Sequence, residues 1–112
     1  MRTLIAVAAL CALAQPALAA DLRFWNLTNA TVTSLTMAPA GTTNFGPNQA
    51  LNDRDKEVDH NERLPLRGVS PGRYDVKLGF AKNRICTVRN VEVKGEGRYA
   101  FSLEQSDLTD CQ

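Results

Sequence analysis

The fold is decided by Pro71-Gly72-Arg73-Tyr74-Asp75-Val76-Lys77-Leu78-Gly79-Phe80. Apolar and polar side chains alternate from Tyr74 to Phe80, which is the period of a β-strand with one buried face. Asp75 and Lys77 fall on the opposite face, which we expect to meet solvent. Pro71-Gly72 is a turn-forming pair, so the chain should enter this strand from a turn. The stretch therefore predicts a half-buried strand.

Two further strands are predicted downstream of it. Residues 84–94 form the partner strand, and a shift in apolar phase between Val88 and Val91 indicates a β-bulge. The glycines of residues 95–97 favour a tight hairpin into a last strand over 98–104. The side chains expected to face inward there are Tyr99, Phe101 and Leu103.

The chain before the decisive stretch repeats the pattern of short strands and turns. Residues 21–28 and 31–38 are predicted strands, and Pro39 ends the second because proline cannot donate to the ladder. Residues 40–52 are rich in turn formers, and 57–67 is an interrupted strand. Because no helical period is sustained, we expect an all-β fold, an antiparallel β-sandwich of about seven short strands. A small closed β-barrel is the alternative.

The first 19 residues have the pattern of a cleavable signal peptide. Arg2 is followed by an apolar run from Leu4 to Leu13, and Ala17-Leu18-Ala19 places small residues at the cleavage site. The run is shorter than the roughly 20 residues that span a bilayer. Residues 20–112 are therefore expected to form one exported domain, periplasmic or secreted, with no membrane span.

Two cysteines would remain after cleavage. Cys11 leaves with the signal peptide, and Cys86 and Cys111 enter an oxidising compartment. Their spacing is not that of a redox C-x-x-C pair, and the single histidine, His60, is distant in sequence. We therefore expect a structural Cys86–Cys111 disulfide.

The charged residues allow a binding face in the C-terminal half. The chain has 13 basic and 12 acidic residues, a balance that argues against nucleic-acid binding. Lys77 should point outward, and basic residues on neighbouring strands can share its surface with an acidic protein or an anionic glycan. Trp25 alternates with Phe24, so one of the two should lie on an exposed face. The candidate binding face comprises Lys77, Arg84, Arg89, Arg98 and Trp25.

An acidic run offers a calcium site as an alternative. Carboxylates at every second position can converge on a hard cation, although Val58 and Leu64 stand where an EF-hand needs glycine and glutamate. A solvated loop or a charged edge strand that discourages edge pairing is the favoured interpretation of the run, since Arg54 and Lys56 neutralise part of its charge. The candidate ligands are Asp53, Asp55, Glu57 and Asp59.

Two stretches resemble known bacterial proteins. Residues 71–76 resemble the turn-plus-strand opening of immunoglobulin-like and prealbumin-like modules, and residues 26–46 resemble small uncharacterised bacterial periplasmic proteins. The resemblance implies a β-sandwich outside the cytoplasm and brings no site residues. A catalytic constellation is not evident, because His60 lies in a polar stretch without a matching nucleophile. We expect a non-enzymatic binding or accessory module without a cofactor, with a calcium-binding module or a small hydrolase or isomerase as alternatives.

Overall fold

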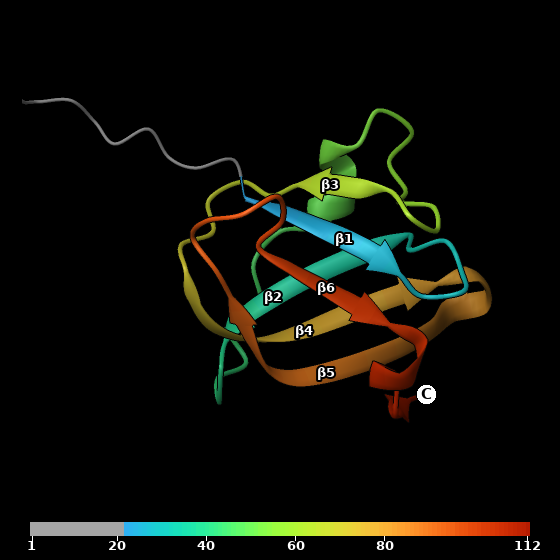
Figure 1. Ribbon diagram of the computed structural model, residues 1–112. Helices are drawn as coiled ribbons and strands as arrows, with labels where there is room; N and C mark the ends of the chain where they lie inside the picture. Colours follow the sequence, from blue (N-terminus) through green and yellow to red (C-terminus); the bar gives the residue numbers. More distant parts are fainter. Residues whose placement is uncertain (1–21) are drawn as a thin grey trace, which may run out of the picture.

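The protein is a two-layered β-sandwich (Figure 1). A computed structural model describes residues 22–112, so the predicted signal peptide lies outside the described residues. Two open sheets, one of three strands and one of four, pack face to face. The all-β sandwich is thus confirmed, and the closed barrel is not the architecture. No helix among residues 22–112 is long and apolar enough to cross a membrane.

The smaller sheet has the strand order β3-β1-β6. Its central strand β1 (Arg23–Leu27) pairs antiparallel with β3 (Arg63–Pro65) and parallel with β6 (Phe101–Glu104). The parallel pair joins strands from opposite ends of the described chain. The expected sandwich was fully antiparallel, and this pair is the exception.

The larger sheet has the order β2-β4-β5-β7 and is antiparallel throughout. Its strands are β2 (Ser34–Pro39), β4 (Gly72–Phe80), β5 (Arg84–Val93) and β7 (Asp110–Cys111). The register between β4 and β5 shifts between Tyr74 and Val76, where Val91 and Val88 are the partners. The predicted bulge is therefore confirmed, and Asn90 inside it has a positive φ of 57°.

The core lies between the two sheets and is built by alternation. Phe24 and Leu64 of the smaller sheet and Leu35, Val76 and Leu78 of the larger one are fully buried. Phe24 and Phe101 lie in contact, with ring centroids 5.1 Å apart. Burial of these apolar faces is the main force that holds the layers together.

The connection from β2 to β3 covers one side of the sandwich. The short 3-10 helix η2 (Gln49–Asn52) lies in it, and two asparagines at the start and end of η2 hydrogen-bond to the edge strands. Asn48 Oδ1 accepts from the backbone N–H of Leu35 in β2, and Asn52 Nδ2 donates to the carbonyl of Pro65 in β3. Each bond occupies one backbone group at a sheet edge, which makes that edge less open to pairing with another chain.

Two local expectations differ from the structure. The strand predicted over 57–67 shortens to β3, because Asn61 has a positive φ of 71° and the residues before it form a turn. The last strand begins at Phe101, so Tyr99 does not face the core as alternation predicted. The stretch around Phe45 forms an irregular loop, as the turn formers of residues 40–52 indicated, and Phe45 packs beside Lys77 on the outer face of the larger sheet.

Candidate functional site

A cluster of aromatic and arginine side chains covers the outer face of the smaller sheet. Trp25 on β1 and Arg63 on β3 are directly opposite in register, and the Arg63 guanidinium carbon lies 4.2 Å from the centroid of the Trp25 ring. The Tyr99 ring packs against Trp25 with centroids 5.2 Å apart. Phe24 points into the core, so alternation places Trp25 outside, as one of the two expected arrangements.

The Trp25 ring is held in place by the segment that precedes β3. Trp25 Nε1 donates to Asn61 Oδ1 at 3.0 Å. The fully buried Asn26 anchors that segment, because its Nδ2 donates to the carbonyl of Val58 at 2.8 Å and its carbonyl accepts from Asn61 N–H. Asn26 Oδ1 also accepts from the hydroxyl of Thr28 at 2.7 Å. A satisfied buried network of this kind fixes geometry, so Trp25 and Arg63 are pre-oriented.

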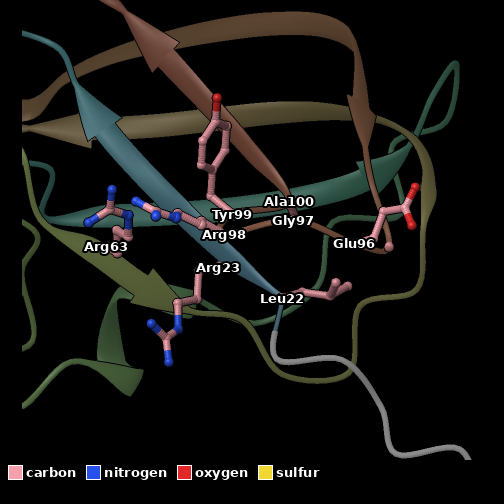
Figure 2. Close-up of a pocket in the computed structure, with 9 residues that line it drawn as sticks. Leu22, Arg23, Arg63, Glu96, Gly97, Arg98, Tyr99 and Ala100 are labelled. Carbon is pink, nitrogen blue, oxygen red and sulfur yellow. The ribbon is translucent and has the colours of Figure 1, made fainter.

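A depression of about 570 Å³ lies beside this cluster (Figure 2). It falls within the range of about 300–1,000 Å³ that ligand sites occupy. Figure 2 shows Arg63 and Arg98 toward one end and Glu96 toward the other, with Arg23 extending in a different direction. The lining residues are Leu22, Arg23, Arg63, Gly95, Glu96, Gly97, Arg98, Tyr99 and Ala100.

The depression is positively charged. Arg63 and Arg98 line it against one glutamate, Glu96, and the third lining arginine, Arg23, has a contact of its own. Within residues 22–112, neither Arg63 nor Arg98 has a carboxylate within ion-pairing distance. Their guanidinium N–H groups are therefore available to an anion from outside, and a guanidinium fork fits a carboxylate, sulfate or phosphate in bidentate fashion.

The residues that the sequence grouped into one binding face do not lie together in the structure. Trp25 lies on the smaller sheet and Arg98 lies in the β5–β6 loop, where it lines the depression, whereas Lys77, Arg84 and Arg89 lie on the larger sheet. With Arg63 and Tyr99, the first two form what we call the aromatic–arginine cluster. Each of the last three contacts another group of the protein, although Lys77 and Arg84, like Arg63 and Arg98, have no carboxylate within ion-pairing distance among residues 22–112. Lys77 Nζ lies 4.4 Å from the Phe45 ring centroid, and Arg84 donates to Cys111 Sγ at 3.4 Å.

Arg89 is engaged by two carboxylates. Its guanidinium lies 3.6 Å from Asp110 and 4.0 Å from Asp75. Asp75 was expected to meet solvent beside Lys77, but it is buried, since it accepts from the backbone N–H of Asn90 at 2.9 Å and of Gly41 at 3.0 Å. The Asn90 bond, then the Gly41 bond and the charge of Arg89, hold its pKa below the ordinary value against the opposing effect of burial.

The four acidic residues of the calcium hypothesis do not converge. Residues 22–112 contain no group of three histidine, cysteine, aspartate or glutamate side chains arranged to hold a metal ion. Asp53 Oδ2 accepts from the backbone of Asp55, and Asp59 Oδ1 accepts from the Thr31 hydroxyl. Calcium binding through Asp53, Asp55, Glu57 and Asp59 stays a prediction from the sequence alone.

His60 has a structural contact. Its Nδ1 lies 2.7 Å from the carbonyl of Thr28, so that nitrogen carries the proton and donates. Its bond ties the turn before β3 to the end of β1, and His60 itself is exposed, as expected for a surface residue.

The two cysteines meet as expected. Cys86 on β5 and Cys111 on β7 form a disulfide between directly paired residues. The bond fixes the C-terminal segment to the larger sheet, on the layer opposite the aromatic–arginine cluster.

No family model matches this sequence, and no curated protein or solved structure matches it either. The site is therefore argued from its own geometry. Sequence reasoning missed Arg23, Arg63 and Tyr99. The alternation of residues 22–25 places Arg23 on the Trp25 face and was a usable signal, whereas the pairing of Trp25 with Arg63 depends on long-range register.

Proposed function

We propose that this protein is an exported, non-enzymatic binding module that takes an anionic ligand on the outer face of its smaller sheet. The aromatic–arginine cluster of Trp25, Arg63, Arg98 and Tyr99 is its binding site. The observation that carries the proposal is the Arg63 guanidinium, stacked on Trp25 and without a carboxylate partner among the described residues.

Export is supported by two independent features. Residues 1–19 have the composition of a cleavable leader. The Cys86–Cys111 disulfide is compatible with an extracytoplasmic location, because such bonds form and persist in oxidising compartments. The periplasm or the medium is the proposed destination.

Pre-organisation of Arg63 lowers the free-energy cost of binding a ligand. A free arginine loses side-chain entropy when a ligand fixes it, at about 0.5–1.5 kcal/mol per immobilised side chain. Arg63 is already held by the Trp25 ring, which is itself held by Asn61. Ligand binding at this position therefore has a smaller ordering cost than binding at a mobile surface lysine.

Charge reversal on the two sheets tests the proposal. The full chain is expressed with a C-terminal tag, crosslinked in its native extracytoplasmic extract, and the captured proteins and glycans are quantified. We expect Arg63→Glu/Arg98→Glu to reduce the amount of the captured species at least tenfold. The matched control is Lys77→Glu/Arg84→Glu, which makes the same change of charge on the larger sheet and should leave capture unchanged.

The opposite pattern would place the site on the larger sheet and overturn the proposal. Equal capture by both variants would also overturn it. Thermal melting of each variant, before the capture, establishes that a loss of binding is not a loss of fold.

A further inference from the structure

The chemistry of the depression specifies more than a negative charge. All three cations that line it are arginines, and lysine is absent from its lining. Arginine differs from lysine in presenting a planar fork of N–H donors that matches an oxyanion with two oxygens. The lining therefore favours discrete carboxylate or sulfate groups over a diffuse negative surface.

Uncharged hydrogen-bonding groups accompany the arginines. Within residues 22–112, the Tyr99 hydroxyl makes no hydrogen bond, although the ring is fixed against Trp25. Gly95 and Gly97 bring backbone to the rim without a side chain, and Gly97 has a φ of +100°, a conformation that favours glycine. The ligand thus meets a phenol and exposed peptide groups, which suit hydroxyl groups.

Two other anionic partners fit the surroundings less well. An extended acidic peptide would add to a strand edge, but the carbonyl of Pro65 at the neighbouring β3 edge already accepts from Asn52. An anionic membrane surface would be met by exposed apolar anchors. The two large apolar side chains that are exposed among the described residues, Leu51 and Ile85, do not line the depression.

We infer that the ligand is an acidic oligosaccharide. Its carboxylate or sulfate groups bind Arg63 and Arg98, and its hydroxyl groups bind Tyr99 and the backbone near Gly97. A sugar ring lies against the Tyr99 ring, which lines the depression, so that its C–H groups meet the negative face of the phenol. This inference rests on the proposed binding function and adds the class of ligand.

The chain supplies its own reporter for the test. Trp25 is the only tryptophan in the sequence, and Arg63 stacks on its ring. A ligand that engages Arg63 should therefore change the fluorescence of Trp25. The experiment titrates the protein expressed from the full chain with an oligogalacturonate and, separately, with a heparin-derived oligosaccharide.

Two comparison ligands separate charge from sugar. Methyl-esterified oligogalacturonate keeps the rings and removes the charges, and polyglutamate of matched charge keeps the carboxylates and removes the rings. We expect at least one acidic oligosaccharide to bind with a Kd at least tenfold lower than that of either comparison ligand. Arg63→Lys and Tyr99→Phe should each weaken that binding, the first more strongly, since lysine keeps the charge and loses the fork.

Each contrary result overturns the inference. Equal binding of polyglutamate would indicate an acidic polypeptide as the ligand class, and equal binding of the esterified chain would remove the role of the carboxylates. Absence of binding to both acidic oligosaccharides would reject the glycan. If neither oligosaccharide binds but Arg63→Glu/Arg98→Glu captures less of the species from the native extract than the wild type does, the proposed binding function stands and only the glycan is rejected.

Discussion

Asp75 shows how a single residue departs from the strand pattern that surrounds it. Alternation assigns it to the outer face of β4, where it does lie, yet it is buried. The chain covers it with the turn after β2 and with the bulge of β5, from which Gly41 and Asn90 donate their backbone N–H groups. Two backbone donors and the nearby Arg89 stabilise the charged form of the carboxylate.

The lowered pKa of Asp75 predicts a stability that depends on pH. Because the folded pKa lies below the unfolded one, the stabilisation is fully present above the ordinary aspartate range and is lost as the pH falls through the folded pKa. Asp75→Asn should lower the Tm at pH 7, since Gly41 and Asn90 donate to different oxygens of the carboxylate and an asparagine has an NH2 group in place of one of them. Between pH 5 and pH 2, the Tm of the variant should fall by fewer degrees than the Tm of the wild type.

Asp55→Asn provides the control for thermal melting across this range. Asp55 is exposed, and its carboxylate has no hydrogen bond among the described residues. Its replacement should leave the acid-induced loss of Tm as it is in the wild type. An Asp75→Asn protein that melts in parallel with the wild type at every pH would contradict the assignment.

At the scale of elements, the contact between β2 and β4 depends on a residue without a side chain. Ser34 and Gly79 are directly opposite in register. A Cβ at Gly79 would fall 2.9 Å from the Ser34 Cβ, closer than carbon atoms approach without a shift of one strand. Gly79 therefore sets how closely the two strands pack at this end of the larger sheet.

Gly79→Ala should destabilise the protein by about 1–3 kcal/mol, the usual cost of overpacking. Ser34→Gly added to it removes the Cβ that the alanine meets, so the double variant should recover most of that loss. Ser34→Gly alone should cost no more than about 1 kcal/mol, from the backbone freedom of glycine. Urea unfolding of the four proteins measures the coupling, and strictly additive losses would show that the two residues do not press on each other.

The same elements show what can be predicted from sequence. Strand β4, the bulge in β5 and the Cys86–Cys111 pair follow from local patterns of alternation and from cysteine number. The distribution of strands between two sheets does not, because it depends on pairings such as β1 with β6, which no local pattern records. For this reason Trp25 was grouped with Lys77 in the sequence, although they lie on different sheets.

At the scale of the whole molecule, the two layers have separate roles. On the larger sheet, Arg89 pairs with Asp75 and Asp110, and this sheet also carries the disulfide. The smaller sheet leaves Arg63 and Arg98 without carboxylate partners among residues 22–112. Stability and ligand binding should therefore respond to different substitutions.

The disulfide provides the sharpest test of this separation. Cys86 and Cys111 are 25 residues apart, and closing a loop of this length restricts the unfolded chain by about 3–4 kcal/mol. Cys86→Ala/Cys111→Ala should lose about that much in urea unfolding, with a further loss for the smaller side chain at the buried Cys86. The wild type unfolded in the presence of a reductant provides the same comparison without a change of side chain.

Ligand binding should be unchanged by the loss of stability on removal of the disulfide, as long as the protein stays folded. Neither cysteine lines the depression, and the network that orients Trp25 and Arg63 runs through Asn26 and Asn61 on the other layer. At a temperature well below its Tm, the disulfide-free variant should bind the captured species or an acidic oligosaccharide within about twofold of the wild type. A folded variant that binds tenfold more weakly would show that the C-terminal tie orders the smaller sheet, and the two layers would then form one functional unit.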